Sequence, residues 1–246
     1  MRGLAETLGL LRSLLLTLPL IYLVTLLLGL AWLLALPFDR ARRGQHGWAR
    51  WWGRLLLAIG GVRVRVHGLE NLETGAHYVF LANHQSYMDV PVVLGHVPGG
   101  FGIMAKAALF PIPLVGWWLR QGGHLPIESN NPRADARRLL QAIRYVREGH
   151  SLFVFPEGGR SVSGAVEPFK PGIFLAALKA GVPIVPVTLK GTRALLARGS
   201  FTLRPGRVDL LFASPIATAG LQRSELEALI ARVHRCIDDS FRRVTS

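Results

Sequence analysis

The feature that most limits how this chain can fold is an uncharged, leucine-rich run from Ser13 to Phe38. About 20 apolar residues suffice to cross a bilayer, and a helix that is apolar on all sides is unusual outside membranes or large cores. We therefore expect an N-terminal membrane helix, which either spans the bilayer or bends at Pro19 and stays in one leaflet. A cleaved signal peptide is disfavoured because the run exceeds the usual apolar segment of ~7–15 residues.

Arginines are much more frequent directly after this run than before it. Because positively charged flanks are retained on the cytoplasmic side, we expect the protein in the membrane with its C-terminal domain in the cytoplasm. Only Arg2 and Arg12 precede the run. The arginines that follow it closely are Arg40, Arg42, Arg43, Arg50 and Arg54.

The segment from Trp48 to Ile59 mixes tryptophans and arginines with an apolar stripe. This pattern fits a helix lying in the membrane interface. It fits an ordinary amphipathic helix packed on the domain equally well, so both interpretations stay open.

The charge of the whole chain indicates a polyanionic partner. The sequence has 29 Lys and Arg against 15 Asp and Glu, a net charge of +14. Such a surplus favours nucleic acid or an anionic membrane. The apolar N-terminus favours membrane lipids, and we expect no nucleic-acid partner because no recognition motif accompanies the charge. The single cysteine, Cys236, supplies neither a disulfide framework nor a cysteine metal site, and we propose no metal.

The rest of the chain alternates between strand-like and helix-like segments. This order predicts an α/β fold, a mixed sheet covered by helices, in a domain of residues 61–246 after an anchoring helical segment of residues 1–60. A capping box of Ser224 and Glu227 is expected to start the last helix. Strands are predicted at residues 62–66, 78–82, 151–155 and 183–189. Helical stripes are predicted through Asn131-Pro132, Ala136, Leu139, Leu140 and Ile143, and through Leu226, Leu229, Ile230, Val233 and Ile237.

The segment that carries the clearest chemical signal is Asn83-His84-Gln85-Ser86-Tyr87-Met88-Asp89, directly after a strand-like run. A histidine can act as a general base near neutral pH. A carboxylate bonded to its second ring nitrogen fixes the tautomer and stabilises the imidazolium. Five residues of one helix would place the two groups about 140° apart. The pair therefore works only if His84 lies in the turn after the strand and Asp89 in the next element.

A second candidate group follows the strand at residues 151–155. Gly158 and Gly159 allow a tight backbone turn. Arg160 then presents a planar fork suited to phosphate oxygens. Glu157 could orient this arginine or accept a substrate hydroxyl, and Lys106 is a further phosphate candidate.

These segments together resemble the 1-acyl-sn-glycerol-3-phosphate acyltransferase family of the glycerolipid acyltransferases. His84 and Asp89 match its H-x4-D motif, and the fit extends over about residues 79–190 in the family's order. Two positions depart from the pattern: Gly159 replaces the usual threonine, and Ser129 replaces a basic residue. The other matching stretches are Lys106 with Leu109, Pro111 and Gly116, Phe155 to Ser161, Phe169 to Gly172, and Val182 to Val187.

The resemblance implies an enzyme of phospholipid biosynthesis. It would transfer an acyl chain from acyl-CoA or acyl carrier protein, with no cofactor, to the sn-2 hydroxyl of a lysophospholipid, 1-acyl-sn-glycerol-3-phosphate. His84 and Asp89 would be catalytic, and Lys106, Glu157, Gly158 and Arg160 would bind substrate. Another lysolipid acceptor, such as a lyso-ornithine lipid, is the alternative. A thioesterase, a non-catalytic membrane adaptor and a nucleic-acid binder are rivals from other classes.

Overall fold

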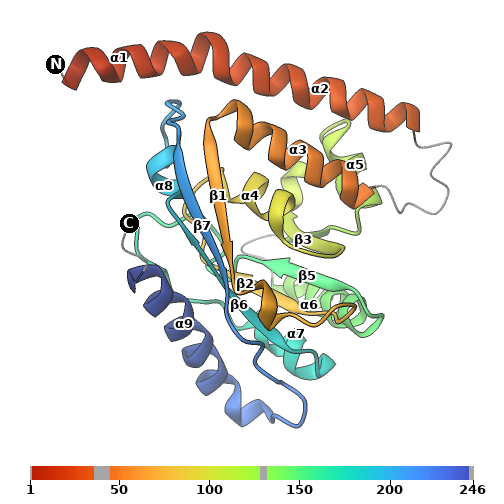
Figure 1. The fold of residues 1–246 in the computed structure, drawn as a ribbon. Coiled ribbons are helices and arrows are strands. Elements are labelled where there is room, and N and C mark those ends of the chain that lie inside the picture. The colour runs from red at the N-terminus through yellow and green to blue at the C-terminus, as the bar shows by residue number, and fades with distance from the viewer. Residues whose placement is uncertain (1, 36–44, 128–131, 244–246) are drawn as a thin grey trace. The chain divides into compact units, whose positions relative to one another are not determined.

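The computed structural model describes residues 2–35, 45–127 and 132–243 of this chain (Figure 1). These residues divide into two compact units. Unit 1 comprises Met1–Arg65, Gln85–Pro98 and Leu189–Leu210, and unit 2 comprises Val66–His84, Gly99–Thr188 and Leu211–Ser246. The predicted domain boundary at residue 60 stays a prediction. Arg40, Arg42, Arg43, Ser129 and Asn131 lie outside the described residues.

The strands of the described residues form one seven-stranded sheet in the order β1-β7-β6-β2-β5-β3-β4. The predicted α/β fold with a mixed, helix-covered sheet is confirmed, as are the predicted strands around residues 62–66, 78–82, 151–155 and 183–189. The strands are β1 Val62–His67, β2 Val79–Ala82, β3 Phe101–Lys106, β4 Leu125–Ile127, β5 Ser151–Val154, β6 Ile184–Lys190 and β7 Gly206–Phe212.

The helices alternate with these strands along most of the chain. The α-helices are α1 Arg2–Arg12, α2 Leu18–Ala35, α3 Gln45–Ile59, α4 Asp89–His96, α5 Val115–Gln121, α6 Pro132–Arg147, α7 Gly172–Ala180, α8 Thr192–Leu195 and α9 Leu226–Arg243. A π-helical turn, η1 Ser13–Thr17, joins α1 to α2, and short 3-10 turns are η2 Leu69–Asn71, η3 Ala107–Leu109 and η4 Arg223–Glu225.

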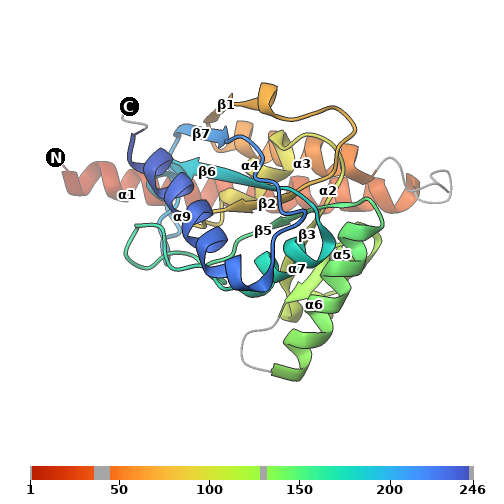
Figure 2. The same ribbon diagram turned by 90° about the horizontal axis from the view of Figure 1, so that it is seen from below.

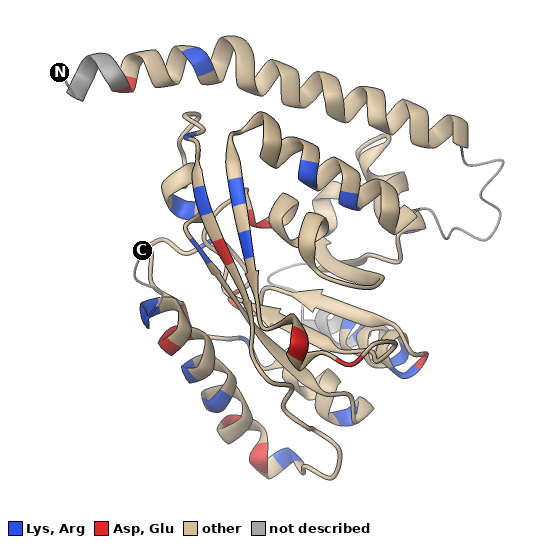
Figure 3. Cartoon of the chain, viewed as in Figure 1, with Lys and Arg blue, Asp and Glu red and all other residues tan. Residues whose placement is uncertain are grey.

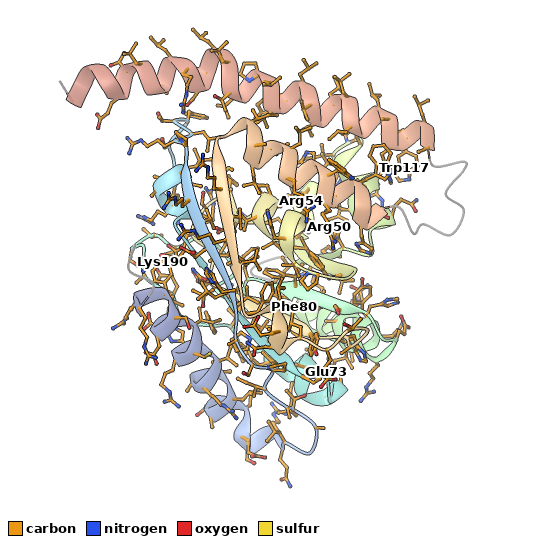
Figure 4. The ribbon with its side chains drawn as sticks, viewed as in Figure 1. Arg50, Arg54, Glu73, Phe80, Trp117 and Lys190 are labelled. Atoms are coloured by element: carbon orange, nitrogen blue, oxygen red, sulfur yellow. The ribbon has the colours of Figure 1, made fainter. Side chains whose placement is uncertain are left out.

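Unit 2 is built around strands β2 and β5, which are buried along their whole length. Figure 2 shows α6, α7 and α9 on one side of these strands. Val79 and Leu81 of β2 face these helices, and their core continues through Phe174 of α7 and Val233 of α9. Phe80, labelled in Figure 4, alternates with these residues along β2. Its ring stacks on Phe153 of β5 at a centroid distance of 6.2 Å. Burial on both faces explains why these strands read as continuous apolar runs.

The strand pairs of unit 2 share one direction. Strand β2 pairs in parallel with β5 and β6, and β3 pairs in parallel with β4 and β5. Because parallel strands end at the same edge, the segments after β2, β3, β4 and β5 all leave the sheet there. In folds of this type ligands bind outside that carboxyl edge.

Unit 1 contains a tightly packed pair of helices, α3 and α4. A Cβ on Gly53 of α3 would lie 2.6 Å from the carbonyl oxygen of Pro91 in α4, so only glycine permits this approach. Arg54 and Arg50, labelled in Figure 4, donate from α3 to the carbonyls of Gly95 and Val97 at distances of 2.9 and 3.3 Å. One face of the predicted Trp48–Ile59 helix is therefore packed on protein, while Trp51 on another face is 73% exposed.

The N-terminal helices run without a charged residue from Ser13 to Ala35 (Figure 3). The described span from Glu6 to Ala35 is long and apolar enough to cross a membrane. Pro19 does not end the helix. The π turn Ser13–Thr17 precedes it, and such a turn relieves the clash between a proline ring and the preceding helical turn.

Polar contacts fasten this helix to other parts of unit 1. The Ser13 hydroxyl accepts a hydrogen bond from the amide of Leu203 at 3.0 Å, and Arg12 donates to the carbonyl of the same leucine at 2.5 Å. Further along, the indole of Trp52 in α3 donates to the Thr25 hydroxyl at 3.0 Å. Many leucines elsewhere on the helix are exposed.

Two sequence predictions were wrong in detail. Leu140 of α6 is 60% exposed, because the buried stripe of the helix runs through Ala142, Ile143 and Val146 instead. The capping box that precedes α9 is formed by Gln222 and Glu225, two residues before the predicted pair. The predicted buried stripe of α9 itself is confirmed.

Candidate functional site

His84 lies in the turn after β2, as the sequence predicts. Its backbone amide donates to a carboxylate oxygen of Glu157 at 3.0 Å, and its carbonyl accepts from the amide of Ser161 at 2.7 Å. Its ring stacks on Phe155 with a centroid distance of 4.1 Å and an interplanar angle of 19°. The segment after β5 therefore holds both the backbone and the imidazole of His84.

Asp89 is the first residue of α4 in unit 1, and its side chain is fully buried. One carboxylate oxygen accepts from the amides of Gln85 at 2.7 Å and Ser86 at 2.8 Å. These are the two residues that follow His84 directly in the chain. The carboxylate therefore closes the turn after His84. Asp89 begins a new helix, as the spacing of His84 and Asp89 predicted.

Glu157 has a structural partner that the sequence did not indicate. It was predicted to orient Arg160 or to accept a substrate hydroxyl, whereas one of its oxygens binds the His84 amide. A hydrogen bond to an ionised acceptor is roughly twice as strong as a neutral one. This contact gives Glu157 a positioning role, and its predicted role in substrate binding stays a prediction.

Gly158 makes the tight turn after Phe155-Pro156. Its φ of +74° lies in the left-handed region, and its amide donates to the Phe155 carbonyl at 3.1 Å. A Cβ at this position would lie 2.7 Å from the Nζ atom of Lys170. A backbone hydrogen bond from Lys170 to the Pro156 carbonyl at 2.9 Å fixes that lysine beside the turn.

Lys170 is a candidate anion-binding residue that was absent from the predicted set. The motif Phe169-Lys170-Pro171-Gly172 was noted in the sequence, but no local pattern places its amine against Gly158. Arg160 follows the same turn and is partly exposed. Lys106 ends β3 and is exposed, so it leaves the sheet at the carboxyl edge described above.

The loop after Arg160 is organised by one carboxylate. Glu167 accepts hydrogen bonds from the hydroxyls of Ser163 at 2.7 Å and Ser161 at 3.0 Å. These bonds, that of Ser163 first, lower the pKa of Glu167 and keep it ionised. The Ser161 hydroxyl also accepts from the Gly164 amide, so its described contacts are those of a loop-stabilising residue.

Two further residues of unit 2, His124 and Cys236, are buried or partly buried. His124 lies in the loop before β4 and is buried, and its Nδ1 accepts from the amide of Ile103 at 2.9 Å. Cys236 lies in α9, where burial and then the charge of Asp239 raise the pKa of its thiol. A raised thiol pKa lowers the fraction of the reactive thiolate.

Comparison with known proteins gives consistent similarities. The sequence model of the Acyltransferase family matches residues 63–190. The chain is 36% identical to a chloroplastic 1-acyl-sn-glycerol-3-phosphate acyltransferase of Brassica napus, over 74% of this chain and 53% of the relative. It is 30% identical to the 1-acyl-sn-glycerol-3-phosphate acyltransferase of Limnanthes douglasii, over 86% and 76% of the two chains. The chain thus spans about half the length of the chloroplastic relative.

A solved structure is similar over the whole chain. The crystal structure of the 1-acyl-sn-glycerophosphate (LPA) acyltransferase from Thermotoga maritima superposes with a TM-score of 0.80 at 30% identity. The similarity covers 100% of both chains.

The two adjacent glycines after Glu157 give a matched test of the turn geometry. We expect Gly158→Ala to lower the free energy of unfolding by roughly 1–2 kcal/mol, because alanine is strained at positive φ and its Cβ would displace Lys170. Gly159→Ala is the control, since a Cβ there meets open space. Denaturant unfolding of both variants measures the difference, and equal stabilities would contradict the assigned turn.

Proposed function

Because this chain belongs to the acyltransferase family that includes the 1-acyl-sn-glycerol-3-phosphate acyltransferases, we propose that it makes phosphatidate from 1-acyl-sn-glycerol-3-phosphate. The acyl chain would come from acyl-CoA or acyl carrier protein. The observation that carries this proposal is the double backbone attachment of His84 to the segment around Glu157 and Ser161. It unites the two sequence blocks that would supply the base and the phosphate-binding group.

The reaction follows from the groups in this segment. A ring nitrogen of His84 removes the proton of the sn-2 hydroxyl while the oxygen attacks the thioester carbonyl. The tetrahedral intermediate then expels the thiolate, which receives the proton from the imidazolium. The stacked Phe155 ring and the hydrogen-bonded backbone hold the imidazole in place, which reduces the entropic cost of reaching the reactive geometry. Asp89 supports the imidazolium by its negative charge.

The acceptor phosphate would be bound after β5. Arg160 supplies a planar guanidinium, and Lys170 lies beside Gly158. Lys106 ends the neighbouring strand β3 at the same carboxyl edge of the sheet. Gly158 has no side chain, so its backbone can approach the acceptor closely.

The family threonine is replaced by Gly159, where a Cβ meets open space, so the turn has room for either residue.

We further propose that the N-terminal helix lies along one leaflet, with the catalytic domain on the cytoplasmic side. Its contacts at Ser13 and Thr25 are twelve residues apart, about 18 Å along a helix, and both are made to polar groups of unit 1. A helix perpendicular to the membrane would draw the segments that carry these groups into the hydrocarbon core, where each polar group without a hydrogen-bond partner costs several kcal/mol. Lying flat, it buries its exposed leucines and leaves unit 1 at the surface.

Spin labels test this orientation. In a Cys236→Ser background, labels at the exposed positions Leu15 and Leu34 should report similar, shallow depths in vesicles of anionic lipid. A label at the control position Arg63, which is exposed on β1, should report an aqueous environment. Labels at positions 15 and 34 on opposite sides of the bilayer would instead establish a spanning helix.

The catalytic proposal is tested at His84 and Asp89. We expect His84→Ala to reduce kcat by about 10²–10⁴-fold or more with unchanged membrane binding, because the base is lost. Asp89→Asn should be equally or less severe, since its amide oxygen can still accept from the amides of Gln85 and Ser86. Phosphatidate formation by purified enzyme in detergent gives the rates. Near-normal turnover of His84→Ala would exclude the mechanism.

The acceptor is tested at Arg160. Loss of a charge-assisted bidentate contact costs about 1.5–3 kcal/mol, so Arg160→Ala should lower kcat/KM for lysophosphatidate about ten- to a hundredfold. Acceptors without a phosphomonoester should be much less affected. An equal loss for all acceptors would show that Arg160 does not recognise phosphate. A wild-type preference for a phosphate-free acceptor, such as a lyso-ornithine lipid, would replace the lysophosphatidate assignment.

A further inference from the structure

A pocket of about 690 Å³ opens in unit 2 beside β3 and β4, with a lining that includes Ala107, just after β3, and Gly123 and His124, just before β4. It shares no lining residue with the predicted set of catalytic and substrate-binding side chains. Its lining joins an apolar part to two arginines and a tyrosine. The residues that matter here are Phe110, Pro111, Leu125, Arg120, Arg138 and Tyr145.

The polar part of this pocket is tightly packed around Tyr145. A Cβ on Gly102 or on Gly123 would lie 2.9 Å from the hydroxyl oxygen of Tyr145, so two glycines make room for this ring. Burial raises the pKa of Tyr145, and a hydrogen bond with the backbone of Gly102 opposes this shift. The neighbouring His124 accepts the Ile103 amide at Nδ1, so in its neutral form Nε2 carries the proton.

The two arginines come from different elements. Arg120, in α5, donates through Nη1 to the carbonyl of Phe110 at 2.6 Å, and this bond orients its guanidinium at the pocket. Arg138 lies on α6 in the same helical row as Tyr145, seven residues later. Two guanidinium groups beside an apolar surface suit a ligand that has one phosphate and a long, weakly polar chain.

The distance between this pocket and His84 indicates which of the two substrates the pocket binds. Strands β3 and β4 lie two and three places from β2 in the sheet, so a pocket beside them is at least about 10–15 Å from the turn that carries His84. In lysophosphatidate the phosphate and the reacting hydroxyl are on adjacent glycerol carbons, so this phosphate must bind close to His84. In a CoA or carrier-protein thioester, a pantetheine arm separates the phosphate from the thioester, and its phosphate must bind farther away.

We propose that this pocket holds the phosphopantetheine arm of the acyl donor, with Arg120 and Arg138 binding its phosphate. The inference rests on the proposed acyltransferase function and adds a donor site to it. The arm is common to CoA and to acyl carrier protein, so the pocket serves either source. The apolar side chains of Phe110, Pro111 and Leu125 contact the arm on its way to His84.

The test compares donors with and without the phosphate. Arg120→Gln/Arg138→Gln should raise the KM for acyl-CoA or acyl carrier protein at least about tenfold, the loss typical of a charge-assisted contact. The KM for the phosphate-free acyl-pantetheine should change less than about twofold, and the KM for lysophosphatidate should not change. Since Arg120 also binds Phe110, Arg138→Gln alone is a second variant and should show part of the same selective rise.

Arg137→Gln/Arg144→Gln is the matched control, because it removes two exposed charges of α6 that do not line the pocket. A selective loss with either phosphorylated donor supports the site and identifies the donor. An equal rise in the KM for acyl-pantetheine, an equal rise in the control variant, or a rise confined to the KM for lysophosphatidate would overturn it.

If the wild type makes no phosphatidate, the proposed function fails. Calorimetric titration with 4′-phosphopantetheine then tests the pocket separately, and absent binding overturns it.

Discussion

The candidate site depends on the two hydrogen bonds that fasten the backbone of His84 to the segment after β5. The Glu157 carboxylate accepts the amide of His84, and the Ser161 amide donates to its carbonyl. Both bonds are made by main-chain atoms of His84 and not by its imidazole nitrogens. The ring position then follows from the peptide plane and from stacking on Phe155. A substitution at Glu157 would therefore act on the base even if Glu157 never touches substrate.

Much of this arrangement could be predicted from the sequence. The apolar runs at residues 78–82 and 151–155 are strands because both of their faces are buried, and the turns that follow them carry His84 and Arg160. Parallel pairing brings those turns to one edge. The spacing of His84 and Asp89 excluded one continuous helix, and Asp89 indeed begins α4.

Other features depended on contacts that local patterns do not encode. Leu140 looked like part of a buried stripe, but α6 is rotated so that Ala142 and Val146 face the core. Two acidic residues near the start of α9 could close a capping box, and Glu225 does so because the helical turn begins earlier. The approach of Lys170 to Gly158 and the burial of His124 arise between segments distant in sequence. Such pairings are fixed by the assembled sheet.

The attachment of the N-terminal helix has a consequence for how the chain is made. Ser13 and its partner Leu203 are separated by 190 positions, so the helix is synthesised well before the segment on which it docks. Synthesis proceeds at roughly 5–20 residues per second, which leaves the helix without its partner for about ten seconds or more. Its leucine-rich surface would promote aggregation in water during that interval. Capture of the helix by a bilayer would protect the nascent chain during that interval.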